Sequence, residues 1–130
     1  MDQQPIVKIE NLSHRYSVQW AVKDIDLEIK THGVYGLLGS NGAGKSTIMN
    51  ILCGVLKQSN GKIYINGVDL KANPVEAKMQ IGFVPDHYAL YENLTGREYV
   101  NYIADLYGVS EEDRTARINE YVDRFNLKVA

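Results

Sequence analysis

Hydrophobic and polar residues alternate with a period of two over much of the first half of the chain. Residues 24–29 (DIDLEI) alternate acidic and aliphatic side chains, which predicts a half-exposed strand of an antiparallel sheet. Residues 6–12 form a second strand-like run, and residues 62–65 (KIYI) lie between two Asn-Gly dipeptides that are typical of turns. The pattern therefore predicts antiparallel strands joined by short turns.

Two further runs are apolar throughout, as expected of strands that are buried on both faces. They are residues 34–38 (VYGLL) and residues 81–85 (IGFVP). The segment that begins at residue 48 places its apolar residues on one helical face: Ile48, Ile51, Leu52 and Val55. A buried strand followed by a helix predicts an α/β arrangement in this part of the chain.

The remaining segments carry helix signals. Asn73-Pro74 fits the N-cap and first position of a short helix that reaches about Gln80. Thr95 begins a capping-box pattern with Glu98, and Ser110 precedes acidic residues that suit the first turn of a further helix. An apolar stripe at helical spacing follows each of the last two caps, and we expect both stripes to be packing faces: Tyr99, Val100, Ile103, Leu106 and Tyr107, then Ile118, Tyr121, Val122 and Phe125.

Composition narrows the class of protein. A chain of 130 residues is in the size range of one domain, and its 45% hydrophobic content is enough for a core. The net charge of -2, with scattered basic residues, gives no sign of a nucleic-acid tract or a polybasic membrane patch. No apolar window has the length of a membrane span, and the amino terminus lacks the features of a signal peptide. We therefore expect a cytoplasmic protein that binds no nucleic acid.

Cysteine and histidine give no independent sign of chemistry. The single cysteine, Cys53, lies in the apolar stretch ILCGVL, so we expect it to pack as a small hydrophobic residue. His14 and His32 have no spacing that suggests metal binding or catalysis, and both are expected at the surface.

The most specific segment is the run GSNGAGKST at residues 39–47, which matches the phosphate-binding pattern GxxxxGK[ST]. It lies between a predicted strand and a predicted helix, which is the context that this pattern requires. Glycines let the backbone take positive φ and approach a phosphate, and the amides at the start of a helix attract an anion. The sequence therefore predicts that the chain binds a nucleoside triphosphate.

The polar residues of this loop have distinct expected roles. Lys45 adds positive charge between the β- and γ-phosphates, and the Ser46 hydroxyl ligates the Mg²⁺ that bridges them. Thr47 steadies the α-phosphate. The nucleotide-binding residues expected in the loop are Gly39, Ser40, Asn41, Gly42, Ala43, Gly44, Lys45, Ser46 and Thr47.

A compact P-loop switch or kinase is one alternative. In that case residues 81–86 would be the apolar strand that ends in a metal-binding aspartate, Asp86. Pro85 directly before the acid, the lack of an Asn-Lys-x-Asp motif and the antiparallel strands before the loop argue against it.

Over about residues 6–127, the order of these segments resembles the ATP-binding subunit of ABC transporters. The resemblance is carried by LLGSNGAGKST, by GKIYINGVD at residues 61–69, and by the segment from Ile81 to Tyr99. It is closest to subunits that energise export-type permeases. It implies a fold of the α/β class: a P-loop NTPase core with an antiparallel β subdomain over about residues 1–93, then the start of a helical subdomain over about residues 94–130.

The resemblance also implies roles for residues outside the loop. Tyr16 corresponds to the aromatic residue that stacks on adenine, and Trp20 competes for that role. Asp86 stands where the family has a Mg²⁺-binding glutamine. Its shorter, charged side chain either contacts the Mg²⁺ or only caps a turn. The loop from Asp86 to Tyr91, with its aromatic residues, is implied to contact a membrane permease.

The remaining motifs of such an ATPase would follow Leu127: the metal-binding aspartate, the glutamate that polarises water, the switch histidine and the signature sequence. We therefore expect the chain to be the amino-terminal part of a longer, truncated ATPase domain. The resemblance implies that the whole protein hydrolyses ATP to power transport, dimerises with a second ATPase subunit, and sits in the cytoplasm against the membrane through its permease.

By itself, the 130-residue chain is expected to bind ATP weakly and to have no catalytic residue of its own. A soluble relative that acts in translation or DNA repair is a further alternative.

Overall fold

The structure is a computed structural model, and it describes residues 3–40, 42, 44–85 and 90–127. The chain separates into two compact units, Met1–Phe83 and Val84–Ala130, and each unit has its own internal packing.

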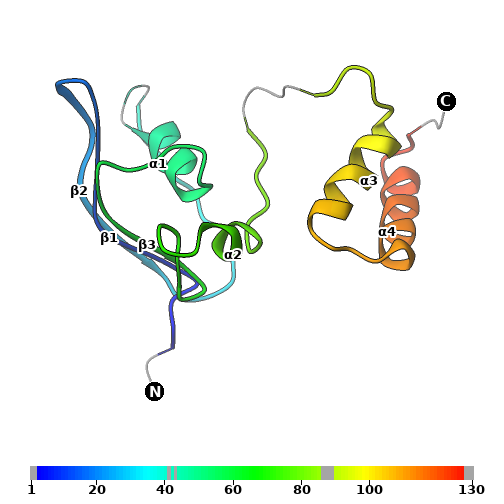
Figure 1. The fold of residues 1–130 in the computed structure, drawn as a ribbon, viewed down its shortest axis with the longest axis horizontal. Coiled ribbons are helices and arrows are strands. Elements are labelled where there is room, and N and C mark those ends of the chain that lie inside the picture. Colours follow the sequence, from blue (N-terminus) through cyan, green and yellow to red (C-terminus); the bar gives the residue numbers. More distant parts are fainter. Residues whose placement is uncertain (1–2, 41, 43, 86–89, 128–130) are drawn as a thin grey trace. The chain divides into compact units, whose positions relative to one another are not determined.

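The first unit is built on a four-stranded antiparallel sheet with the strand order β2-β1-β3-β4 (Figure 1). Its strands are β1 (Val7–Tyr16), β2 (Gln19–Ile29), β3 (Asn60–Ile65) and β4 (Val68–Asp69). The three predicted antiparallel strands are therefore confirmed. β1 continues beyond its predicted end, and β2 starts before its predicted beginning. As a result, Tyr16 pairs with Gln19 across a two-residue turn.

The hairpin of β3 and β4 shows how local chemistry sets the turns. Asn66 and Gly67 both have positive φ, at 48° and 78°, as a type I′ turn requires. Asparagine and glycine adopt these angles at the lowest cost, so the predicted turn forms at this dipeptide.

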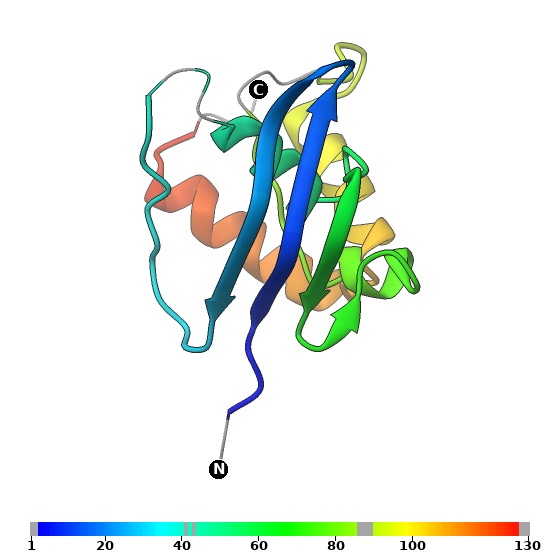
Figure 2. The same cartoon turned by 90° about the vertical axis from the view of Figure 1, so that its left-hand side faces the viewer.

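Helices α1 (Lys45–Leu52) and α2 (Pro74–Lys78) pack on one face of the sheet, and Figure 2 shows the strands from the opposite side. The core forms between the strands and these helices, and its buried members are Ile9, Leu12, Val22, Ile51, Ile63, Ile65, Leu70 and Ala77. Pro74 occupies the first turn of α2, as predicted, although the Asn73 side chain makes no capping hydrogen bond.

The two predicted buried strands do not form. Residues 34–38 and 81–85 are not in strand conformation, and Leu38 is 93% exposed. Among the described residues, neither run joins the sheet. A strand forms only where a neighbouring strand supplies its hydrogen-bond partners, and apolar composition alone does not supply that neighbour.

The second unit is a pair of helices, α3 (Gly96–Leu106) and α4 (Glu111–Arg124). Both predicted caps are confirmed, because Thr95 Oγ1 accepts from the Glu98 amide and Ser110 Oγ accepts from the Asp113 amide, each at 3.2 Å. Arg114 joins the two helices. Its guanidinium donates to the Val109 carbonyl at 2.6 Å and forms an ion pair with Asp105 at 2.7 Å.

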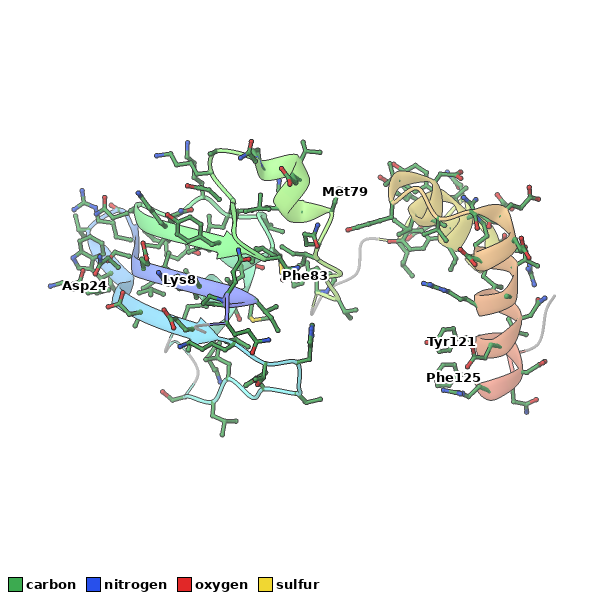
Figure 3. The ribbon with its side chains drawn as sticks, turned by 90° about the horizontal axis from the view of Figure 1, so that it is seen from below. Lys8, Asp24, Met79, Phe83, Tyr121 and Phe125 are labelled. Carbon is green, nitrogen blue, oxygen red and sulfur yellow. The ribbon has the colours of Figure 1, made fainter. Side chains whose placement is uncertain are left out.

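The expectation that both apolar stripes are packing faces is confirmed only in part, because some stripe residues are half-buried and the others are exposed. The half-buried ones are Tyr99, Ile103, Ile118 and Val122. α3 buries only Ala104, and α4 buries no residue. Figure 3 shows Tyr121 and Phe125 side by side on α4, with ring centroids 6.0 Å apart and Phe125 64% exposed. Helical spacing determines which face is apolar, but it does not supply a partner that covers the face.

None of the helices in the described part of the chain has the length and apolar character that a bilayer crossing requires.

Candidate functional site

The site begins at the amino-terminal end of α1. Gly44 is the N-cap residue, with φ 91°, and no side chain caps the helix. The first turn also contains no acidic residue. Because the first amides of a helix have no intrahelical acceptor, this helix start presents donors and a positive dipole end to a ligand.

Gly44 also lets the loop lie close to strand β2. A Cβ atom at this position would lie 2.5 Å from the Ala21 carbonyl oxygen and 3.0 Å from Cγ2 of Val22, both on β2. Gly42 has φ 84°, so both described glycines in the middle of the loop take the positive φ that the sequence predicts. The loop therefore needs glycine for its backbone angles and, at Gly44, also for its contact with β2.

Lys45 follows the cap directly and closes the loop on itself. Its ammonium group donates a hydrogen bond to the carbonyl oxygen of Gly39. This contact joins the two ends of the phosphate-binding pattern and holds a positive charge beside the first turn of α1. Asn41 and Ala43 lie outside the described residues, and Ser40 is exposed.

A cavity of about 380 Å³ lies between this loop and the hairpin of β1 and β2. The lining residues include five of the expected loop residues and two aromatic residues of the hairpin, and they contain no carboxylate: Tyr16, Gln19, Trp20, Ala21, Gly42, Gly44, Lys45, Ser46 and Thr47. The cavity is thus lined by two aromatic rings, Tyr16 and Trp20, and by one positive charge, Lys45.

The two aromatic candidates lie at the same cavity in different surroundings. The Tyr16 hydroxyl lies 3.5 Å from Oγ1 of the buried Thr47, and Tyr16 is 53% exposed. The ring of Trp20 is covered by the Arg15 guanidinium, 5.5 Å from the ring centroid. Arg15 thus packs on the Trp20 ring, whereas the Tyr16 hydroxyl approaches the first turn of α1.

His14 is not at the surface, contrary to expectation. It is only 8% exposed, and its ring meets that of Tyr16 edge-on, with centroids 4.8 Å apart. His14 lies in β1 beside the β1–β2 pairing, where the interior side of the sheet buries it. Cys53 behaves as expected, since partial burial raises the pKa of its thiol and keeps it protonated.

Gln19 and Ala21 line the cavity although the sequence did not single them out. The sequence feature that could have identified them is the turn between β1 and β2. Because Tyr16 pairs with Gln19, recognition of the two-residue turn at residues 17 and 18 would have placed Gln19 beside Tyr16.

Asp86 lies outside the described residues, as do residues 87–89. Of the expected permease-contact loop, Leu90 and Tyr91 are described and both are exposed. The Tyr91 ring lies 6.4 Å from that of Tyr99 and 6.1 Å from that of Tyr102. Within the described ranges, no group of His, Cys, Asp or Glu side chains is arranged to hold a metal ion.

The chain is similar in sequence and in structure to known proteins. Residues 22–130, most of the chain, match the family described as ABC transporter. The ABC transporter ATP-binding protein NatA from Bacillus subtilis (strain 168) is 36% identical over 109 residues, which cover 83% of this chain and 44% of NatA.

Two solved structures have the same fold. The first is described as the structure of the ATP-binding subunit of an ABC transporter. It is 31% identical, with a TM-score of 0.87, over 94% of this chain and 51% of that one. The second is a dimeric post-hydrolysis state of an ATP-binding cassette bound to ADP and Pi, 28% identical with a TM-score of 0.77, over 94% of this chain and 58% of that one. The chain therefore spans about half the length of each of these three proteins.

Proposed function

Since this chain belongs to the ABC transporter family, as part of its ATP-binding domain, we propose that the cavity beside residues 39–47 binds ATP together with Mg²⁺. The observation that carries the proposal is the uncapped start of α1 next to Lys45, in a cavity without a lining carboxylate. A polyphosphate is the ligand that this combination of amides, dipole and ammonium group favours.

Different residues of the cavity bind different parts of the ligand. The amides of the first turn of α1 and the Lys45 ammonium bind the β- and γ-phosphates, and Lys45 exchanges the Gly39 carbonyl for phosphate oxygens. The Ser46 hydroxyl, which lines the cavity, would hold Mg²⁺, and the ion would neutralise part of the phosphate charge. The Tyr16 ring stacks on the base.

The whole protein, in this proposal, hydrolyses ATP to drive transport. Two observations on its relatives support that role: NatA carries the name of an ABC transporter ATP-binding protein, and a solved cassette of this fold is a dimer with ADP and Pi. The described residues that line the cavity contain no group that would activate water. Hydrolysis therefore requires residues other than these.

The partner proposals follow from the same family. The whole protein pairs with a second ATPase subunit and lies on the cytoplasmic side of a membrane, bound to a permease through the loop from Asp86 to Tyr91. The exposed Tyr91 supports the last point, since aromatic residues anchor many interfaces. Residues up to about 93 form the nucleotide-binding core and the following residues begin a helical subdomain.

Titration of the 130-residue chain with ATP and Mg²⁺ by calorimetry tests the binding site. We expect saturable binding that Lys45→Ala weakens at least about tenfold, because a hydrogen-bonded charge at a phosphate is lost. The matched control is Lys57→Ala, which removes an exposed lysine that does not line the cavity and leaves the affinity unchanged. Equal affinities for wild type and Lys45→Ala would contradict the proposed site.

A further inference from the structure

His14 carries a buried polar atom that no hydrogen bond within the described residues accounts for. Its Nδ1 atom is inaccessible to solvent and has no hydrogen-bond partner in the described structure. Burial of a polar nitrogen without a partner is unfavourable, so hydrogen bonding at Nδ1 does not explain a histidine at this position, and a contact of its ring explains it better.

The contact is with Tyr16. The two rings meet at an interplanar angle of 80°, and their centroids are 4.8 Å apart, which is the edge-to-face arrangement that aromatic pairs favour. β1 is irregular in its pairing on both sides of His14, between Leu12 and His14 and between His14 and Arg15. Such irregularities change the direction of side chains along a strand.

Tyr16 is therefore held at two points. His14 packs against its ring from the buried side, and the Tyr16 hydroxyl approaches Thr47 of α1. A half-exposed tyrosine with no such neighbours would lose rotamer freedom whenever it stacked on a base. A ring already fixed by its surroundings loses less, so base binding becomes more favourable.

We propose that His14 is a positioning residue for nucleotide binding, which fixes the Tyr16 ring as the platform for the base of the nucleotide. This inference rests on the proposed function, and it assigns His14 a role toward the base and none toward the phosphates.

The distinction between base and phosphates gives the test. The chain contains one tryptophan, Trp20, which lines the cavity, so its fluorescence reports occupancy by ATP and by inorganic tripolyphosphate, each with Mg²⁺. For His14→Leu, we expect ATP affinity to fall about threefold to tenfold, the range for loss of an aromatic pair. Tripolyphosphate affinity should not change, because that ligand has no base.

Three further variants separate positioning from folding. His14→Phe keeps a ring against Tyr16 and should retain the ATP affinity of the wild type. His32→Leu makes the same change at an exposed histidine and should alter neither affinity. If thermal unfolding shows that His14→Leu does not fold, His14→Gln, of similar length but without a ring, replaces it and should show the same split between the ligands.

Equal losses for ATP and tripolyphosphate in a folded ring-less variant, or no loss for ATP, would overturn the positioning role of His14. A wild-type chain that binds neither ligand would instead contradict the proposed function.

Discussion

At the scale of single residues, Gly44 is the position in the phosphate loop whose surroundings most clearly require glycine. Its φ of 91° belongs to the region that residues with a side chain disfavour, and a Cβ atom would lie only 2.5 Å from the Ala21 carbonyl oxygen. The backbone angle and the contact with β2 both require glycine. The phosphate loop keeps its shape because two separate constraints meet at one residue.

Gly44→Ala is therefore expected to displace the loop from β2. We predict that the free energy of unfolding falls by about 1–3 kcal/mol and that ATP affinity drops about tenfold or more. Urea denaturation and calorimetric titration measure the two effects. Gly36→Ala is the matched control, since nothing lies within 4 Å of its Cβ position, and it should resemble the wild type. A Gly44→Ala chain with wild-type stability and affinity would contradict the contact with β2.

Residue types predicted the loop better than they predicted its surroundings. The glycines and Lys45 follow from a local pattern, and Gly42 and Gly44 have the predicted positive φ. Burial of His14 and the approach of Ala21 to Gly44 depend on how β1 pairs with β2. The turn of this hairpin, Ser17-Val18, is not a typical turn dipeptide, and Ala21 and Gly44 are far apart in the sequence, so no local pattern predicts either feature.

At the scale of elements, the caps of the second unit follow from local sequence alone. The Thr95 hydroxyl accepts from the Glu98 amide at 3.2 Å and donates to the Glu98 carboxylate at 3.0 Å. The residue types of a capping box thus suffice to set the start of α3. By contrast, residues 34–38 and 81–85 have the composition of buried strands but do not join the sheet. A helix cap forms from residues within one turn, whereas a strand also needs a second strand to pair with.

Thr95→Ala is expected to lower the stability of α3 by about 1 kcal/mol, because one amide of the first turn loses its acceptor. Thermal unfolding followed by circular dichroism measures the change. Thr95→Ser keeps the hydroxyl and should recover most of it. Neither variant should change ATP affinity, since the described cavity is lined by residues of the first unit only. Full stability of Thr95→Ala would show that the cap contributes nothing to α3.

At the scale of the whole molecule, the family and the α/β class were predictable because the phosphate-binding pattern occurs with its antiparallel strands and capped helices. The matches over residues 22–130 confirm the family. The extent to which the apolar faces are buried was not predictable. Tyr121 and Phe125 remain exposed on α4, and Leu38 is exposed before the loop. A sequence shows which side chains are apolar, but it does not show which surface covers them.

The central claim is that backbone amides at the start of α1, together with Lys45, bind the polyphosphate of a nucleotide. Amide chemical shifts of the ¹⁵N-labelled chain, recorded while ATP and Mg²⁺ are added, test it most directly. We predict that the largest changes occur at Gly44, Lys45, Ser46 and Thr47, and that tripolyphosphate reproduces them. Amides of α4 (Glu111–Arg124), which do not line the cavity, should not shift. Changes centred on another element, or none at the start of α1 under saturating ATP, would contradict the claim.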